Sequence, residues 1–236
     1  MTQPKSSPQS KQSESQMLIS YMLLRKLIGA LGVALPFALV IGGIIYGKCE
    51  FIENSISDYY HTEMRNVLVG TLCAVALFMF AYRGHDRRDS IAGNLACVFA
   101  LGVAFFPTSV DTVSECATNC IFYEPWISYV HFASALFFFC VLIYFCLFLF
   151  VEPRKREYEL SQEKKKRNMV FRISGYIMIF CILCIAVYFI FFDEDPEIKQ
   201  LDVVFWFEAI ALLAFGISWL TKGQLVLKDK PETSAE

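Results

Sequence analysis

Ser57, Asp58 and His61 lie within five residues of one another in the segment SISDYYHTEMRN, residues 55–66, directly before an apolar run. A carboxylate and an imidazole can exchange protons with a substrate, and both can bind a metal ion. A serine hydroxyl beside them can donate or accept a hydrogen bond. The segment therefore predicts acid-base or metal chemistry at the start of an apolar helix, with Ser57 and Asp58 as candidate catalytic residues.

Asp111, His131 and Glu208 are further ionisable residues in or beside apolar runs. His131 lies four residues into its run and Glu208 five residues into its own, so a rise of about 1.5 Å per residue puts both about 6 to 8 Å below one boundary. Asp111, a third candidate catalytic residue, follows the run that ends in FFPTSV. Ionisable groups at membrane depth cost roughly 2.5 to 3.5 kcal/mol at a helix centre, so they are usually paired or functional. We therefore expect these residues to share one layer with residues 57–61.

The first interpretation of this layer is a metal site. His61, His131 and a carboxylate from Glu208 or Asp111 form a two-histidine, one-carboxylate set, which leaves a catalytic metal one open position for water. Zinc is the candidate metal, and a metal-bound water is then the nucleophile of a hydrolase.

The second interpretation is a structural network. Here Arg65 neutralises Glu208, while His131 bonds to Ser57 or Tyr60, and the polar groups hold helices together. The sequence leaves both interpretations open.

The elements that must position these residues are membrane helices. The chain has 236 residues, of which 56% are hydrophobic, and its mean hydropathy of +0.47 exceeds what a soluble core requires. A helix crosses a hydrocarbon core of roughly 30 Å in about 17 to 25 residues. Six runs are long enough or nearly so, near residues 27–46, 67–82, 91–106, 127–151, 170–192 and 203–220. Backbone groups in lipid must be satisfied within the element, so we predict an all-α bundle of six transmembrane helices.

Charge predicts the topology of this bundle. Lys and Arg crowd the regions before the first run, between the second and third, and between the fourth and fifth. Since basic residues resist translocation, these regions and both termini are predicted to be cytoplasmic, in an inner or plasma membrane. The domains are then a disordered or interfacial tail over residues 1–24, a membrane domain over 25–222 and a disordered tail over 223–236. The basic stretch PRKREYELSQEKKKRN is either this topology signal or a contact with anionic lipid.

Cysteine and tryptophan positions give two further expectations. Six cysteines lie within apolar runs and are expected to pack as small apolar side chains. Cys116 and Cys120 are predicted to face the other side from the cytosol, where they can close a ring with each other or pair with Cys49. The three tryptophans lie near helix ends and are expected to anchor at the interface.

The motif Ser57-x-x-x-His61-Thr62 resembles the serine-histidine motif of the alkaline-ceramidase and adiponectin-receptor superfamily of intramembrane hydrolases. That resemblance implies zinc bound by three histidines, with a serine and an aspartate assisting the metal-bound water and the substrate carbonyl. By position, His61 becomes a ligand, Ser57 a polar helper and Asp111 the aspartate. The superfamily has seven spans and a His-x-x-x-His pair on its last helix, whereas this chain has six predicted spans and places Glu208 there.

A second resemblance covers most of the chain. The stretches SISDYYHT, RGHDRRDSIAGNLACVFALGVAFFPT and FWFEAIALLAFGISWLTKG are similar to those of bacterial six-span membrane proteins of unknown function. This resemblance implies a compact helix bundle and no particular mechanism.

Two functions follow from the sequence. One is a metal-dependent hydrolase of lipid amides or esters, and the other is a non-enzymatic sensor, carrier or assembly factor whose polar layer is structural or binds a ligand. No phosphate-binding loop, nucleotide fingerprint or nucleic-acid patch is present in the sequence. The expected partners are therefore membrane lipids, with no nucleotide and no nucleic acid.

Overall fold

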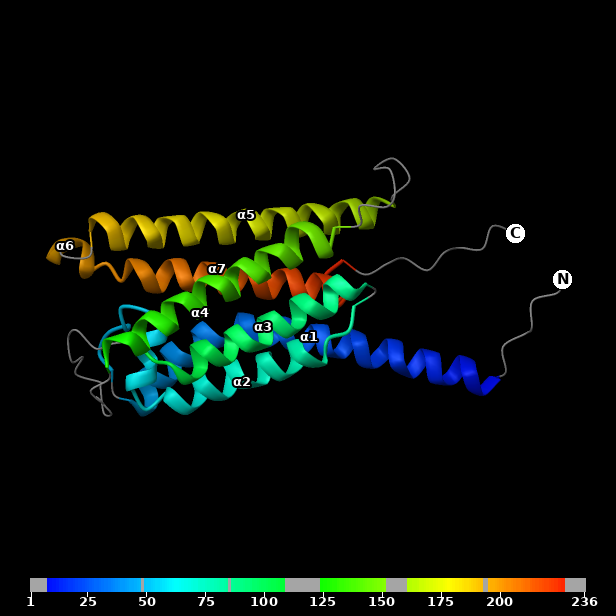
Figure 1. Cartoon of the computed structure of the whole chain (residues 1–236), viewed down its shortest axis with the longest axis horizontal. Coiled ribbons are helices and arrows are strands. Elements are labelled where there is room, and N and C mark those ends of the chain that lie inside the picture. Colours follow the sequence, from blue (N-terminus) through cyan, green and yellow to red (C-terminus); the bar gives the residue numbers. More distant parts are fainter. Residues whose placement is uncertain are drawn as a thin grey trace.

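The computed structural model describes residues 8–47, 49–84, 86–108, 124–151, 161–192 and 195–227 (Figure 1). Within these residues the secondary structure is entirely helical, which confirms the predicted all-α class. In chain order the elements are α1 (Pro8–Tyr46), η1 (Ser57–His61), α2 (Arg65–Ala81), α3 (Arg87–Phe105), α4 (Pro125–Tyr144), η2 (Phe145–Leu149), α5 (Gln162–Phe191), α6 (Pro196–Lys199) and α7 (Val203–Lys222).

Five helical segments in the described part of the chain are long and apolar enough to cross a membrane, so the protein is an integral membrane protein. They are Ile19–Tyr46, Arg87–Phe105, Pro125–Leu149, Gln162–Phe191 and Glu197–Lys222. The second predicted span corresponds to α2, which is apolar but has only 17 residues. Its crossing of the membrane stays a prediction.

Helix α1 is longer than the sequence indicated. It begins at Pro8 and continues for 39 residues, so residues 8–24, predicted as a disordered or interfacial tail, are helical. Pro8 suits the first position of a helix because its ring fixes φ and its missing N–H has no helical partner to lose. In Figure 1 the N-terminal part of α1 extends beyond the bundle.

The long helices close into a ring. Each of α1, α2, α3 and α4 packs against the next helix, α5 packs against α7, and α7 returns to α1. The closing contact between α1 and α7 is made at two glycines. A Cβ atom at Gly29 would lie 2.7 Å from the carbonyl oxygen of Gly216, and one at Gly216 would lie 2.7 Å from that of Gly29. Only the absence of side chains lets the two backbones approach so closely.

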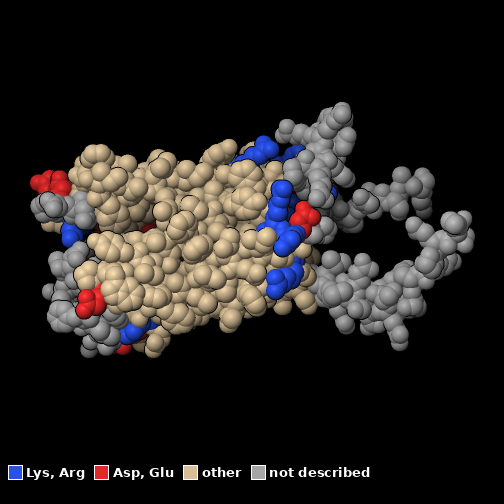
Figure 2. Space-filling model, in the orientation of Figure 1, with Lys and Arg blue, Asp and Glu red and all other residues tan. Residues whose placement is uncertain are grey.

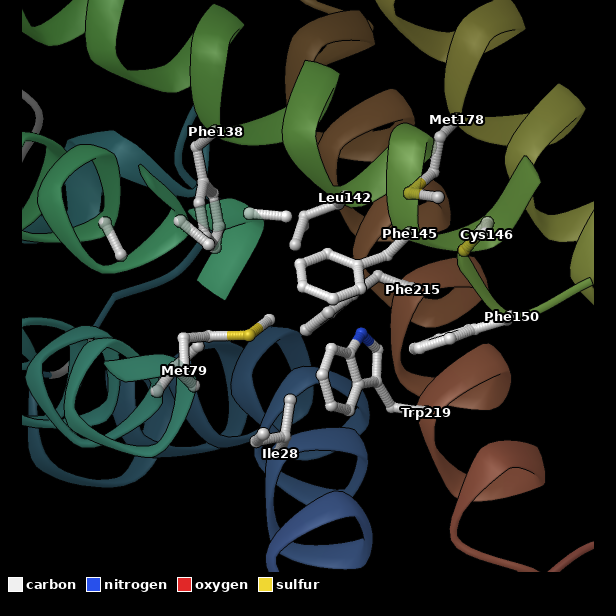
Figure 3. Packing of buried hydrophobic residues seen from close by; sticks show 14 of the residues in the cluster. Ile28, Met79, Phe138, Leu142, Phe145, Cys146, Phe150, Met178, Phe215 and Trp219 are labelled. Atoms are coloured by element: carbon white, nitrogen blue, oxygen red, sulfur yellow. The ribbon is translucent and has the colours of Figure 1, made fainter. Parts of the chain in front are cut away.

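An aromatic cluster fills the half of the ring that lies away from η1, with Trp219 at its centre (Figure 3). Trp219 is fully buried, and its ring meets those of Tyr82, Phe145 and Phe150 at centroid distances of 5.0 to 5.3 Å. The prediction that Trp219 anchors at the interface is therefore wrong, because the position faces the interior of the ring. The other two tryptophans, Trp126 and Trp206, are exposed, and their role as interfacial anchors stays a prediction.

The segment that follows α4 supplies Phe145, Cys146 and Phe150 to this cluster. Between Phe145 and Leu149 the helix widens to the π form of η2, and Phe150 N–H donates to the Phe145 carbonyl at 2.8 Å. An i→i+5 register shifts the later side chains around the helix axis relative to a regular α-helix. Phe145 and Cys146 are both fully buried, and the Cys146 thiol lies 3.2 Å from the Ser218 hydroxyl of α7.

The two ends of the bundle differ in charge: Figure 2 shows Lys and Arg gathered at one end and a mixture of acidic and basic residues at the other. We call the end that holds η1 and α6 the η1 end, and its described charged residues are mostly acidic. The other, basic end carries Arg25, Lys26, Arg83, Arg87, Arg88, Lys164, Lys165, Lys166, Arg167, Arg172 and Lys222. This polarity agrees with the charge pattern of the sequence, while the side of the membrane that each end faces stays a prediction.

Cys49, at the C-terminal end of α1, is disulfide-bonded. The described cysteines within the helices, at positions 73, 97, 140, 146, 181 and 184, have free thiols. Cys116 and Cys120 lie outside the described residues, so the predicted pairing between them is not observed.

Non-reducing peptide mapping is expected to recover Cys49 linked to a peptide that contains Cys116 or Cys120, because the other six cysteines carry free thiols. Single Cys116→Ser and Cys120→Ser variants identify which of the two is joined, since only one substitution releases Cys49 for alkylation. Alkylation of Cys49 in the unreduced wild-type protein, or a bond between Cys116 and Cys120, would contradict this pairing.

Candidate functional site

The short helix η1 presents Ser57, Asp58 and His61 at the η1 end, where the chain passes from α1 to α2. Side chains of residues just before and after η1 hydrogen-bond to its backbone and stabilise its turns. The Ser55 hydroxyl accepts from the Asp58 N–H at 3.1 Å, and the Thr62 hydroxyl donates to the Tyr59 carbonyl at 2.9 Å. Ser and Thr favour such local bonds over a continuing α-helix, so the segment stays a tight 3₁₀ turn.

Helix α7 holds this segment from one side. The Phe205 N–H donates to the Asn54 carbonyl at 2.9 Å, and the Ile56 N–H donates to Glu208 Oε2 at 2.7 Å. The first contact satisfies one of the N–H groups that the start of any helix leaves without a helical partner. Together they place Glu208 directly against the backbone that leads into Ser57.

Arg65 does not neutralise Glu208, and that part of the predicted structural network is wrong. Its guanidinium donates to the Tyr60 hydroxyl at 2.7 Å and lies 4.3 Å from the centre of the Tyr60 ring. An arginine stacked on an aromatic ring gains a cation–π contact in addition to the hydrogen bond. Glu208 instead accepts a hydrogen bond from the backbone N–H of Ile56.

His131 of α4 joins Ser57 to the segment after α3. Its Nδ1 lies 2.6 Å from the Phe106 carbonyl oxygen, and its Nε2 lies 3.0 Å from the Ser57 Oγ. A carbonyl oxygen only accepts, so in the neutral ring Nδ1 carries the hydrogen and donates it. Nε2 is then the acceptor, and the Ser57 hydroxyl donates to it. The predicted bond between His131 and Ser57 is confirmed.

Thr108 is held by two residues of η1. His61 Nε2 lies 3.0 Å from the Thr108 carbonyl oxygen, and the Thr108 hydroxyl donates to Asp58 Oδ1 at 3.1 Å. The two histidines therefore bind neighbouring carbonyls of one short segment, His131 at Phe106 and His61 at Thr108. Residues 106–108 form the link between η1 and α4.

Burial raises the pKa of Asp58 above its ordinary value, and hydrogen bonds to Ser55 and Thr108 and the nearby His61 oppose that shift. Glu208 lies close enough for the two carboxyl groups to interact electrostatically. Burial also raises the pKa of Tyr59 to about 12, so this phenol stays neutral at physiological pH. The surroundings of Asp58 thus favour its protonated form more than water does.

The site is not sealed. Ser57, Asp58 and Glu208 are half-buried, whereas His61 and His131 are buried. Near the η1 end, Figure 2 shows a hollow between α5 and the helices below it in this view, with Asp or Glu atoms visible at its floor. A hollow in the flank of a membrane bundle gives a small molecule a route to polar groups that otherwise face the interior.

The structure brings together five of the predicted site residues, Ser57, Asp58, His61, His131 and Glu208. Asp111 lies outside the described residues. The sequence reasoning missed Thr108 and the Phe106 carbonyl, although the FFPTSV stretch held a signal. The residue before a proline is pushed to extended backbone, and Phe106, with φ −111° and ψ 100°, ends α3 there. Its carbonyl is thereby turned away from the helix.

Comparison with known proteins places the chain in a family. Residues 28–221 match the family model described as Protein of unknown function (DUF998). The chain belongs to the DUF998 family. No curated protein and no solved structure matches it. The matched range extends from α1 to the end of α7 and includes every described residue of the site. The family description states no activity, so the geometry of the site must support any functional proposal for this DUF998 protein.

Proposed function

We propose that this DUF998 protein is an integral-membrane hydrolase of lipid esters or amides, with Ser57 as nucleophile and His131 as general base. The observation that carries the proposal is the pair of bonds made by His131. A nucleophile bonded to a base, which a third group orients in turn, is the arrangement that activates a serine. Here the third group is the Phe106 carbonyl, which fixes the ring and its tautomer.

The chemistry follows from these positions. The Ser57 oxygen attacks the carbonyl carbon of the substrate while its proton passes to His131 Nε2. The imidazolium then gives this proton to the departing alkoxide or amine, and an acyl ester of Ser57 remains. A water molecule, deprotonated by the same Nε2, attacks that ester and releases the carboxylic acid and Ser57. Asp58 and its Thr108 partner hold the backbone around the nucleophile.

The membrane placement in the proposal follows the charge pattern. Six helices cross the bilayer, including α2, with both termini in the cytosol and the η1 end at the outer face of a plasma membrane. The hollow at the η1 end then opens at a depth where an ester or amide bond of a lipid meets water.

Zinc held by His61, His131 and Glu208 is the other route to hydrolysis. Each of these groups is engaged with protein atoms: His61 with the Thr108 carbonyl, His131 with Ser57 Oγ, and Glu208 with the Ile56 N–H. In the described ranges, no three His, Cys, Asp or Glu side chains are grouped so as to hold a metal ion. As bonded here, His61, His131 and Glu208 do not fit a three-ligand site, so no step is derived through zinc. Zinc stays a prediction that the metal content of the purified protein tests.

A fluorophosphonate probe tests the serine mechanism directly. We expect the purified protein in detergent to be labelled at Ser57, because the His131 base activates that hydroxyl, and prior treatment with a zinc chelator to leave labelling unchanged. Peptide mass spectrometry locates the label.

Ser128→Ala is the matched control for Ser57→Ala. Ser128 lies on the same helix as His131, and its buried hydroxyl has no hydrogen-bond partner among the described residues, so its substitution removes none of the described bonds of the site. Labelling should persist in Ser128→Ala and vanish in Ser57→Ala. Folded wild-type protein that resists the probe, or a label that survives Ser57→Ala, would count against the proposal.

A non-enzymatic role is the second candidate, and one observation favours it. His61 and His131 both bind backbone carbonyls of residues 106–108, as they would in a network that only fixes helix packing. That role predicts that His61→Gln and His131→Gln lower the thermal stability alike, with neither probe labelling nor hydrolysis in the wild-type protein.

A further inference from the structure

Helix α5 is longer than the membrane it crosses. Its 30 residues extend about 45 Å at 1.5 Å per residue, whereas the hydrocarbon core is roughly 30 Å thick. Twenty residues separate Phe192, just past the η1 end of α5, from Arg172, which corresponds to about 30 Å. If the η1 end of α5 lies at one boundary of the hydrocarbon, Arg172 lies at the other, at the level of the lipid phosphates.

Arg172 points away from the bundle. Its exposed neighbours on the same face are Met169, Ile173 and Tyr176, with exposed fractions of 62%, 47% and 64%. The opposite face, which includes Phe171 and Ser174, is buried against other helices. Figure 1 shows α5 at the edge of the bundle, so this exposed face meets lipid.

The charge of Arg172 has no counter-ion among the residues that the structure describes. Among the described residues, no hydrogen bond or ion pair joins its guanidinium to another group. Lys165 lies seven residues earlier, two helical turns along the same face, and no Asp or Glu occurs in α5 after Glu163. This face therefore combines two positive charges with an apolar surface at the expected depth of a phosphate layer.

We propose that the face formed by Lys165, Met169, Arg172 and Tyr176 binds the phosphodiester of an anionic phospholipid. A guanidinium offers a planar pair of donors that matches two phosphate oxygens. The Lys165 ammonium adds a second charge toward water, and the Tyr176 hydroxyl adds a donor toward the hydrocarbon. Phe180 and Leu183, both exposed further along α5, lie beside the acyl chain.

The occupant is a lipid and not free phosphate, because exposed apolar side chains flank Arg172 on the side toward the bilayer centre. A soluble anion would gain nothing from them, whereas an acyl chain packs against them. An anionic head group is favoured over a zwitterionic one since the face carries only positive charge, each such residue contributing roughly 1 kcal/mol near an anionic surface.

Native mass spectrometry of the full-length protein in mild detergent, titrated with phosphatidylglycerol or phosphatidylcholine, tests the site. The wild-type protein is expected to retain one phosphatidylglycerol more tightly than phosphatidylcholine. Arg172→Gln is expected to weaken phosphatidylglycerol binding about tenfold, because a hydrogen-bonded charge pair is lost. Millimolar inorganic phosphate should not displace the lipid.

Lys166→Gln is the matched control, since it removes the same charge from an exposed position of α5 that lies about 120° around the helix from Arg172. It should change phosphatidylglycerol binding less than about twofold, and size-exclusion profiles verify that both variants are folded. Equal binding by Arg172→Gln and wild type would overturn the site. So would equal losses in the two variants, equal affinity for the two lipids, or displacement by phosphate.

Discussion

His131→Gln is expected to reduce hydrolysis of a fluorogenic fatty-acyl ester by about 10³-fold or more, a loss typical of removing a general base. Glutamine can still donate to the Phe106 carbonyl, but its amide cannot take the proton of Ser57. The variant therefore keeps the hydrogen bond that orients the side chain at position 131 and removes only its ability to act as a base. Initial rates in detergent micelles, measured beside the thermal stability of the same samples, give the result.

The decisive comparison is with Ser57→Ala and the double variant. Residues that act as one unit lose activity in a strongly non-additive way, so the double variant should be about as active as either single variant. If the two residues contributed independently, the fold losses in rate of the two single variants would multiply in the double variant. A folded His131→Gln protein with wild-type rates would remove His131 from the reaction and leave its bonds a structural role.

The membrane character of the chain could be predicted because apolar runs of sufficient length are visible in one dimension. Five of the six predicted runs correspond to long helices in the described residues, and α2, with 17 residues, lies at the lower limit for a crossing. The position of Trp219 could not be predicted in the same way. A tryptophan near a helix end is an anchor or a core residue depending on which side of the helix its neighbours cover, and only the closed ring decides this for Trp219.

Which residues lie together in the site could be predicted from their depth along the apolar runs. Which groups they hydrogen-bond to could not. Counting residues from the run boundaries placed His131 and Glu208 in one layer, where the structure has them bonded to the η1 segment. The partners are mostly backbone groups, namely the Phe106 and Thr108 carbonyls and the Ile56 N–H. Every residue has such groups, so sequence alone gives no sign of which ones meet a histidine. Arg65 is an example, because its guanidinium contacts the nearby Tyr60 and not the carboxylate of Glu208.

Gly216→Ala is expected to lower the free energy of unfolding by about 3 kcal/mol, at the upper end of the usual cost of overfilling a packed interior. The added Cβ would lie 2.7 Å from the Gly29 carbonyl oxygen and 2.8 Å from the Val33 nitrogen. These are backbone atoms of α1, so no side-chain rotation relieves the contact and the two helices must separate. Because α1 and α7 close the ring, their separation loosens the whole bundle.

Gly70→Ala supplies the matched control for this contact. Gly70 lies in α2 and is exposed, and no atom of the described residues outside its own helix turn lies within 4 Å of an added Cβ, so the same substitution there should stabilise the helix by about 1 kcal/mol or less. Gly29→Ala should resemble Gly216→Ala, and the double variant should lose less than the sum of the two, since both act on one contact. Unfolding in mixed micelles compares the variants. Equal stability of Gly216→Ala and Gly70→Ala would show that the α1–α7 contact has room for a side chain, contrary to the close approach of these backbones.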